Sequence, residues 1–273
     1  MTLDEWQRAL LPLLRRMSFN TSSVQDVTLL AYHFWDDERI DELFYRVECS
    51  FLCAFKCFGL MRSVLVVNKE TPLIRRFCER FGVELQVERG LSGGLPAMNI
   101  DCNANLHRRF NTEYVLTIES DGMPVRSGLE SFVGKWDYVG APWQVVRQPW
   151  YLRVFPDYLV GNSGFCLRSK RICRYASVFY KMLFQWFPYN FLTIEDIFYC
   201  KTIRWLNPFA RSKYAFPSPE EAAKFSIESG CQFAPLDPPM AFHGSAGFDE
   251  YVVRYGLPFR ELLETTSCGE TRV

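Results

Sequence analysis

The chain has 273 residues, enough for one large domain or two small ones, and 48% of them are hydrophobic, which is ample for a buried core. Its 31 basic and 31 acidic residues cancel, which argues against a nucleic-acid binder because such proteins usually carry a clear basic excess. No apolar run is long enough to span a bilayer, and none near the start has the form of a signal peptide. The ten cysteines include no C-x-x-C pair, so we expect a reduced, cytoplasmic protein.

The first 24 residues predict an amphipathic helix, which we place over residues 4–17. Trp6 and Leu10 lie on its apolar side, whereas Arg15 and Arg16 lie elsewhere. Most helices of this kind pack on their own domain. The alternative is that the helix rests on an anionic membrane surface.

The next hundred residues alternate buried strands with helices. One helix is expected to start at Asp36 or Asp37 and to reach Phe58, and another to lie between the N-cap Thr71 and Gly82. The remaining predicted elements are strands over 27–32, 63–67, 83–87 and 114–118, a glycine-rich loop over 91–94 and a helix over about 96–110. This β-α-β order predicts an α/β fold with a mainly parallel central sheet and helices on both faces.

The second half of the chain is more irregular, with short strands, many aromatic residues and several prolines. We expect strands over 138–143 and 161–168, and helices over 170–186, from 193 and from 219. We assign residues 25–263 to a single domain and residues 264–273 to a tail.

Two carboxylates follow the buried run Tyr114–Ile118 directly. Charged groups do not fit inside a strand that is buried on both faces, so Glu119 and Asp121 should lie at its carboxyl end, where open parallel sheets bind ligands. Two acids at this spacing on an extended chain point the same way and can hold one hard cation. The alternative is an ordinary Asp-Gly turn in water.

The sequence lacks the motifs of several common enzyme classes: there is no G-x-G-x-x-G after the first strand, no P-loop and no G-x-S-x-G. The order of its other motifs, over about residues 25–245, resembles the GT-A-fold glycosyltransferases, and in particular a bacterial group long described only as a domain of unknown function. The motifs are Tyr114–Asp121, Tyr138–Trp143, Gly161–Arg168, Glu195–Phe198, Ala222–Glu228 and Phe242–Gly244. The resemblance implies a nucleotide-binding half, residues 25–125, and an acceptor and sugar half, residues 126–263.

The resemblance also implies a divalent cation, Mn²⁺ or Mg²⁺, that neutralises the charge on a departing nucleotide diphosphate. Asp121 matches the last Asp of the family's D-x-D motif, and His243 matches a late ligand to the metal or the diphosphate. Glu119 replaces the first Asp of the motif, so it touches either the ribose or a metal-bound water. The alternative for His243 is a core imidazole bonded to the backbone.

Glu195 and Asp196 match the acidic pair that supplies the base in inverting members of the resembled class. A sugar hydroxyl is a poor nucleophile near neutral pH, so a carboxylate has to take its proton. We predict Asp196 as this base, with Glu195 as its neighbour. The alternative is that Thr193 and Asp196 form a capping box at a helix start.

Five further residues are predicted to contact the donor or acceptor. Asn162 and Gly164 belong to an expected sugar-binding loop, because small residues let backbone amides approach hydroxyl groups. Trp143 is expected either to stack on a sugar or to lie in the core. Tyr32 and His33 follow the first strand, where the resembled enzymes dock the nucleotide base.

The sequence therefore predicts a metal-dependent glycosyltransferase that moves a sugar from a nucleotide-diphospho-sugar to a glycan or lipid-linked acceptor, in surface polysaccharide or glycolipid synthesis. The alternatives are a metal-dependent phosphoester hydrolase and a non-catalytic sugar-nucleotide or glycan-binding module. The aromatic stretch 179–191 either packs inside the domain or, helped by Arg15 and Arg16, attaches the protein to the inner face of a membrane.

Overall fold

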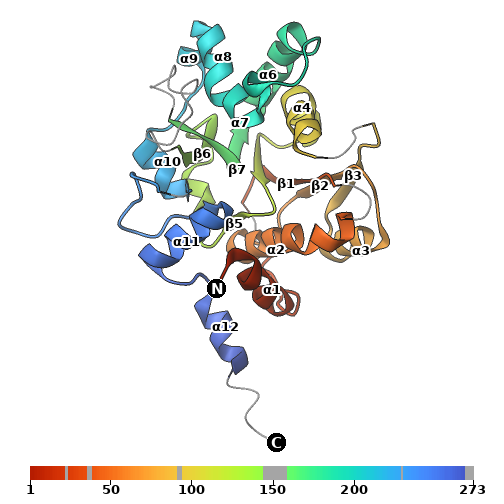
Figure 1. Ribbon diagram of the computed structural model, residues 1–273, viewed down its shortest axis with the longest axis vertical. Helices are drawn as coiled ribbons and strands as arrows, with labels where there is room; N and C mark the ends of the chain where they lie inside the picture. The colour runs from red at the N-terminus through yellow and green to blue at the C-terminus, as the bar shows by residue number, and fades with distance from the viewer. Residues whose placement is uncertain (22–23, 36–38, 91–93, 144–158, 229, 268–273) are drawn as a thin grey trace, which may run out of the picture.

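A computed structural model describes residues 1–21, 24–35, 39–90, 94–143, 159–228 and 230–267 (Figure 1). The described strands form a six-stranded sheet in the order β3-β2-β1-β4-β7-β6 and a three-stranded sheet in the order β5-β9-β8. The strands are β1 (Val27–His33), β2 (Ser63–Val67), β3 (Glu84–Val87), β4 (Tyr114–Ile118), β5 (Gly122–Pro124), β6 (Tyr138–Pro142), β7 (Val160–Ser169), β8 (Ser226–Ile227) and β9 (Ala241–His243). The α-helices are α1 (Leu3–Leu14), α2 (Ile40–Phe58), α3 (Pro72–Phe81), α4 (Leu95–Asn105), α6 (Lys170–Leu183), α7 (Glu195–Ile197), α8 (Ile203–Leu206), α9 (Pro208–Lys213), α10 (Pro219–Phe225), α11 (Gly244–Tyr255) and α12 (Arg260–Ser267).

The first four strands of the large sheet are parallel, as the alternating pattern predicts. Strand β1 pairs in parallel with β2 and β4, and β2 pairs in parallel with β3. Helix α3 begins after Thr71, whose side chain accepts from the Ile74 amide, and ends at Gly82 with φ 66°. Both ends of this helix are therefore confirmed.

The second half adds two antiparallel strands to the same sheet. Strand β7 lies between β4 and β6 and runs antiparallel to both. The sheet is thus mixed, with three parallel and two antiparallel pairings among its described strands.

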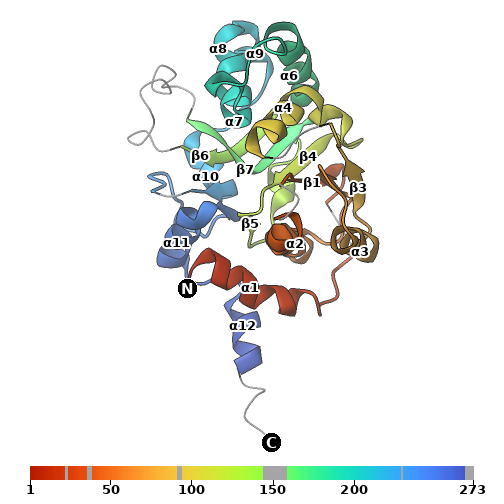
Figure 2. The same ribbon diagram turned by 45° about the vertical axis from the view of Figure 1, so that its right-hand side comes forward.

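Helices cover both faces of the large sheet (Figure 1 and Figure 2). Helices α2 and α3 pack on one face, with α1 outside them against α2, while α4 and α6 pack on the other. Each face buries its own apolar cluster, one around Phe51 and Phe55 and the other around Phe198 and Tyr199. The expectation of an α/β fold with helices on both faces is confirmed.

The N-terminal helix α1 belongs to the core. Trp6 is fully buried, stacks on the ring of Phe259 at 6.2 Å and donates from Nε1 to the Pro258 carbonyl at 3.1 Å. Arg15, just beyond the helix, is ion-paired with Glu48 of α2. The apolar face of α1 is thus covered by protein in this structure.

Several predicted helix ends move by a turn or less. Helix α4 stops at Asn105 and continues as a 3₁₀ turn over Leu106–Arg108, whereas α6 stops at Leu183 instead of residue 186. Helix α2 begins at Ile40 after Arg39, which makes no side-chain cap hydrogen bond; the predicted caps Asp36 and Asp37, like loop residues 91–93, lie outside the described residues. In the described part of the chain, no helix combines the length and apolar character needed to cross a membrane.

Candidate active site

Glu119, Asp121 and His243 meet at the carboxyl end of β4. His243 Nε2 lies 3.4 Å from Asp121 Oδ1 and 3.8 Å from Glu119 Oε2. One ligand atom from each residue lies within 4.8 Å of the others. Two carboxylates and one imidazole, partly exposed at the end of a buried strand, therefore share one small volume.

The small sheet brings His243 to the two acids although it lies more than 120 positions away in the sequence. Strand β5 follows Asp121 directly and pairs antiparallel with β9, with Gly122 opposite His243. The Gly244 amide donates to the Asp121 carbonyl at 3.0 Å, which closes this ladder beside the cluster. The acids thus belong to the parallel half of the chain and the imidazole to the irregular half.

Two helices also form hydrogen bonds to the turn between β4 and β5. Ser50 of α2 donates to the Glu119 carbonyl at 3.0 Å, and the buried Gln7 of α1 donates to the Ser120 carbonyl at 2.8 Å. The Gly122 amide donates to the Glu119 carbonyl at 3.1 Å. Helix α1 therefore contributes directly to the position of the carboxylates.

Gly164 on β7 makes room for the imidazole. A Cβ at this position would lie 1.9 Å from His243 Cδ2 and 2.0 Å from Nε2, closer than side-chain atoms can approach. The Gly164 carbonyl accepts from the Glu119 amide at 2.8 Å. Glycine is required here by the close approach of β7 to the cluster.

The electrostatics of the cluster favour its charged forms. Burial lowers the pKa of His243, but hydrogen bonds and charges from Asp121 and Glu119 outweigh burial and raise that pKa well above its ordinary value. Burial raises the pKa of Asp121, but His243 reverses the effect and leaves it lowered. The two carboxylates and the imidazole therefore stabilise one another's charged forms.

The same donor set fits a divalent cation. Carboxylate oxygens suit Mg²⁺ and Mn²⁺, and a neutral imidazole nitrogen suits Mn²⁺. His243 Nδ1 is buried, has no hydrogen-bond partner within the described residues, and lies 4.0 Å from Glu228 Oε1. Glu228, the last residue of the motif Ala222–Glu228, therefore lies beside this nitrogen without forming a hydrogen bond to it.

Asp196 lies in the first turn after the Asn190–Thr193 segment. The predicted capping box of Thr193 with Asp196 is wrong, because Thr193 pairs with Asn190 instead and Ile194 is the N-cap of α7. Asp196 Oδ1 accepts from the Ile197 amide at 2.6 Å. Burial, with smaller contributions from the charges of Glu119 and Glu228, raises the pKa of Asp196 to about 6. Its carboxyl is therefore tuned toward proton transfer near neutral pH.

Glu195 points away from solvent and is ion-paired with the fully buried Arg168 of β7. Asn99 accepts from the Glu195 amide at 2.7 Å, and the Cys102 thiol lies 3.7 Å from Glu195 Oε1. Arg168 also donates to Thr117 Oγ1 at 3.1 Å. The structure gives Glu195 a counter-ion role beside Asp196, and Arg168 is a residue that the sequence analysis missed.

A cavity of about 280 Å³ opens beside Glu119, at the end of β1. Tyr32, Phe34 and Trp35 line it together with Met98 and Ser120. His33 does not line it: alternate side chains of a strand face opposite ways, and β1 extends through His33.

His33 lies fully buried against α2 instead. Its Nε2 is 2.7 Å from the Ile40 carbonyl oxygen, and burial lowers its pKa to about 4. Of the two residues predicted to contact the nucleotide base, the structure brings only Tyr32 to the cavity.

Asn162 and Trp143 lie on β7 and just after β6. The expected loop is wrong, because Asn162 and Gly164 both belong to β7. Asn162 Oδ1 accepts from the Gly164 amide at 3.2 Å, so its side chain supports the part of the strand that contacts His243. Trp143 packs on Gly161, where a Cβ would meet its ring at 2.2 Å, and the buried Lys201 ammonium lies 4.7 Å from its centre. Burial lowers the pKa of Lys201 to about 8.

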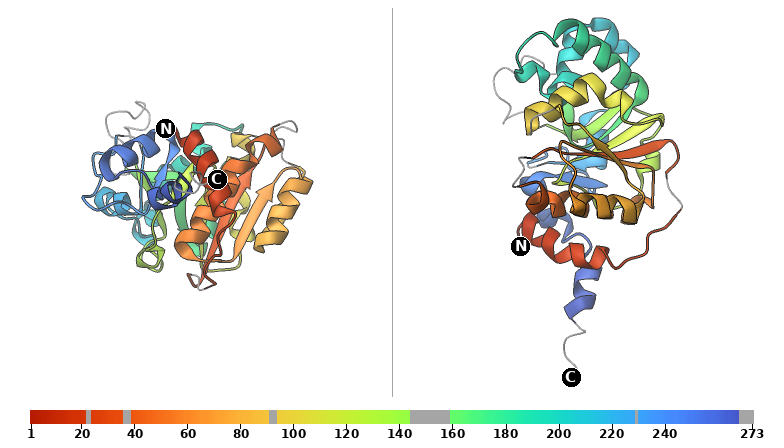
Figure 3. Two further views of the ribbon diagram at one scale, coloured as in Figure 1. Left: turned by 90° about the horizontal axis from the view of Figure 1, so that it is seen from below. Right: turned by 90° about the vertical axis from the view of Figure 1, so that its right-hand side faces the viewer.

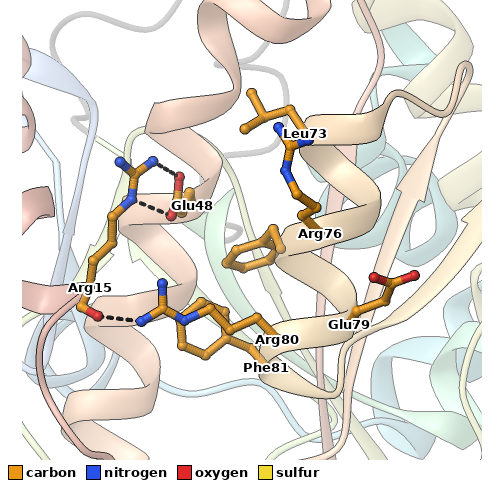
Figure 4. Close-up of a pocket in the computed structure, with 8 residues that line it drawn as sticks. Arg15, Glu48, Leu73, Arg76, Glu79, Arg80 and Phe81 are labelled. Carbon is orange, nitrogen blue, oxygen red and sulfur yellow. Dashed lines mark hydrogen bonds and ion pairs between the residues drawn. The ribbon is translucent and has the colours of Figure 1, made fainter.

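A larger cavity, of about 660 Å³, lies on the outer side of helices α1 to α3 (Figure 4). Arg15 and Arg80 line it, but Arg15 is already paired with Glu48, and Arg80 donates to the Arg15 carbonyl at 2.6 Å. Volume alone does not identify the site, because this cavity contains none of the carboxylate and imidazole cluster.

The fold is that of the GT-A glycosyltransferases. Mouse xyloside xylosyltransferase 1 in its apo form is similar over 80% of this chain and 97% of that chain, with 10% identity and a TM-score of 0.50. More distant matches are galactosyltransferase LgtC with donor and acceptor sugar analogues (15% identity, 90% and 97% covered, TM-score 0.46) and a glycosyltransferase involved in glycosylation of the major capsid of PBCV-1 (14%, 89% and 98%, 0.41). At these identities the similarity shows the fold alone.

The chain belongs to the family described as "Protein of unknown function (DUF5672)", whose model matches residues 97–243. That range runs from α4 to the last residue of β9, so it includes Glu119, Asp121, Asp196 and His243. No curated protein matches the sequence.

Proposed function

We propose that this protein is a metal-dependent glycosyltransferase that uses a nucleotide-diphospho-sugar as donor and a hydroxyl group as acceptor. The observation that carries the proposal is the meeting of Glu119, Asp121 and His243 at the carboxyl end of β4, beside an aromatic cavity, on a GT-A fold. In open α/β sheets this edge is the place where ligands bind.

The cluster would hold Mn²⁺ or Mg²⁺ through Asp121 and His243, with Glu119 on the ribose or on a metal-bound water. Bound there, the cation would neutralise the negative charge that grows on the diphosphate as the sugar leaves. Gly164 and the Asn162 side chain keep β7 close to His243 and so fix the ring in the cluster.

The aromatic cavity is the place for the nucleotide base. Tyr32, Phe34 and Trp35 offer ring surfaces, and Glu119 and Ser120 lie at the same opening, so a base in the cavity has its ribose beside the acids. The Tyr32 hydroxyl donates to Asp101 Oδ2 at 2.9 Å, and Asp101 is paired with Arg109, which holds the Tyr32 ring in place.

Asp196 would act as the general base on the acceptor hydroxyl. Its carboxyl has a pKa of about 6, so it is mostly ionised near pH 7 and still basic enough to accept a proton in the transition state. A base that activates the acceptor for direct attack gives inversion at the anomeric carbon. Glu195, paired with Arg168, positions the backbone from which Asp196 projects.

Calorimetry with a panel of nucleoside diphosphates, with and without Mn²⁺, tests the proposal, followed by release of nucleoside diphosphate from the matching sugar donors. We expect one nucleotide to bind at least tenfold more tightly with Mn²⁺, and its sugar donor to be turned over. Glycan binding without nucleotide binding would favour the binding module. Phosphate release from simple esters would favour the hydrolase.

The place of the reaction is part of the same proposal. We propose a cytoplasmic enzyme whose acceptor is a glycan or a lipid-linked saccharide, in surface polysaccharide or glycolipid synthesis. The described cysteines, which are all free and almost all buried, support a reducing compartment.

A further inference from the structure

The end of the molecule formed by α6, α8 and α9 exposes an unusual amount of apolar surface. Trp186 is 83% exposed, Phe209 82% and Met182 71%, and these three residues come from different segments of the chain. Single exposed apolar residues are normal in soluble proteins, but a group of large ones on one surface marks an interaction site. We call Val178, Met182, Trp186, Phe187, Trp205 and Phe209 the apolar end surface.

The segments that carry these residues lie together. Val178 and Met182 lie one turn apart on α6, and Trp186 follows just past the end of the helix. Tyr175, one turn before Val178, contacts Asn207 Nδ2 through its hydroxyl group and packs on Tyr214 with ring centres 5.3 Å apart. Helices α8 and α9, which carry Trp205 and Phe209, are thereby joined to α6, and the three helices lie together at the top of the molecule in Figure 1, Figure 2 and the right panel of Figure 3.

A row of basic side chains borders this surface along α6. Lys170, Arg174 and Lys181 recur at helical spacing on one edge of the helix, and Arg108 lies next to that edge. The 3₁₀ turn Leu106–Arg108 packs against α6, which places Arg108 beside this edge. Lys181 Nζ donates to Asn105 Oδ1 at 3.4 Å just before the turn, and Lys170 Nζ donates to the Phe110 carbonyl just after it, so the four cations lie along one border. The acidic groups that face this row are Glu113, near Lys170, and Asp101, which is already paired with Arg109.

We propose that the apolar end surface, together with this basic row, docks the protein on the surface of a membrane that contains anionic lipids. Aromatic side chains favour the headgroup region, and Lys and Arg beside them meet the negative surface potential. The basic row distinguishes this occupant from an apolar protein partner, which would have no use for several cations along one border. The proposal does not depend on the proposed chemistry.

The N-terminal helix takes no part in this surface. It lies at the opposite end of the molecule from α6, α8 and α9 (Figure 1 and Figure 3), its apolar face is buried, and Arg15 is paired with Glu48. The idea that Arg15 and Arg16 act together with stretch 179–191 is therefore not supported by the structure. In the present proposal the basic side chains come from α6 and not from Arg15 and Arg16.

Co-sedimentation of the full chain with vesicles tests the proposal. We expect binding to phosphatidylcholine vesicles that contain about one third phosphatidylglycerol at about 0.05 M salt, and loss of most binding at about 0.5 M salt. Vesicles of phosphatidylcholine alone should bind weakly. No pelleting with the anionic vesicles at low salt would overturn the proposal.

Two variants locate the surface. The double variant Trp186→Ser with Phe187→Ser, and the double variant Arg174→Gln with Lys181→Gln, should each weaken binding about tenfold or more. The matched controls are Val253→Ser, at an exposed apolar side chain of α11, and Arg16→Gln, beyond α1; both should bind like the unaltered protein. Equal effects of the controls and the surface variants would overturn the assignment.

Gel filtration of the same variants tests whether a second copy of the chain covers this surface instead of a membrane. Trp186, Phe187 and Arg174 are exposed, and half-buried Lys181 makes a long hydrogen bond to Asn105 Oδ1 at 3.4 Å. Circular dichroism and thermal unfolding of the variants should therefore stay close to those of the unaltered protein. We expect all of them to elute at the same position without vesicles. A dimer that dissociates in the Trp186→Ser, Phe187→Ser variant would show that a second copy covers the surface, and would overturn the proposal.

Discussion

The two halves of the large sheet contribute to the site in different ways. The parallel half, β1 to β4 with α2 to α4, repeats one local pattern, and its last strand, β4, is followed directly by Glu119 and Asp121. In the second half, β7 pairs antiparallel with β4, and the separate pairing of β5 with β9 brings His243 to the two acids. The first half therefore supplies the two carboxylates of the cluster, whereas the second half supplies its imidazole and the base of the proposed mechanism.

The largest expected effect is on turnover and lies in the second half. Asp196→Asn should lower the rate of sugar transfer about 10²–10⁴-fold, because the acceptor loses its base, while donor affinity stays nearly unchanged. The Asn oxygen still accepts from the Ile197 amide, so stability should change little. Steady-state rates and donor calorimetry separate the two effects. A stable variant that keeps its turnover would remove Asp196 from the mechanism.

Breaking the buried ion pair of β7 should cause the largest loss of stability. Arg168→Met leaves the carboxylate of Glu195 buried without its partner, which costs about 3–5 kcal/mol. Urea unfolding measures the loss. The double variant Arg168→Met with Glu195→Gln is the control, and it should recover much of the stability because no unpaired charge remains. A single variant that loses less than about 1 kcal/mol would contradict the pairing.

Gly164→Ala tests the close approach of the two halves. The added methyl group has to displace the His243 ring, so we expect a loss of about 1–3 kcal/mol in stability and weaker Mn²⁺-dependent binding. Gly90→Ala is the matched control, because among the described residues an added Cβ would meet nothing nearer than Glu88 Oε1 at 3.9 Å. Equal metal affinity in both variants would show that the ring does not need this position.

The pKa of Asp196 predicts how the rate depends on pH. Because burial raises this pKa to about 6, the basic carboxylate form declines as the pH falls through 6. The rate should therefore be flat near pH 7.5 and fall about tenfold for each unit below 6. A rate profile for kcat between pH 5 and pH 8, at about constant ionic strength, measures this. A limb centred near pH 4 would point to an ordinary exposed carboxylate.

The smallest effect is expected in the parallel half. Ile74→Val, in the buried face of α3, removes one methylene group and should lower stability by about 0.5–1.5 kcal/mol. Nucleotide binding and turnover should not change, because α3 lies outside the site. Thermal unfolding and calorimetry on one sample measure both. A loss of metal affinity would mean that the two halves are coupled more tightly than their contacts indicate.

Local patterns predicted most of the parallel half. A continuous apolar run is enough to place β2 and β4, and Thr71 and Gly82 mark helix ends because each has a specific hydrogen-bonding or backbone role. His33 marks the limit of such patterns. Strand β1 is one residue longer than predicted, so His33 belongs to it and its side chain faces the opposite side of the sheet from Tyr32. A sequence pattern does not fix the end of a strand to one residue.

The second half was harder to predict, because its structure depends on contacts between segments that are far apart in the sequence. Glu119 and Asp121 are only two positions apart in the sequence, and the resemblance supplied His243, but nothing local indicates that β7 runs antiparallel beside β4. In the sequence, Arg168 looks like an ordinary strand residue. Only the structure shows that its guanidinium is fully buried beside Glu195. The Thr193 prediction failed because Asn190, three residues earlier, competes for the same capping interaction.

The central claim is that Asp121 holds a divalent cation for a nucleotide diphosphate. The most direct test is calorimetric titration of the nucleotide with and without Mn²⁺ for the unaltered protein, Asp121→Asn and the control Asp237→Asn, an exposed acid elsewhere on the chain. We predict that Mn²⁺ raises the affinity of the unaltered protein and of the control, and that a folded Asp121→Asn variant loses this gain. Unchanged Mn²⁺-dependent affinity in that variant would contradict the account.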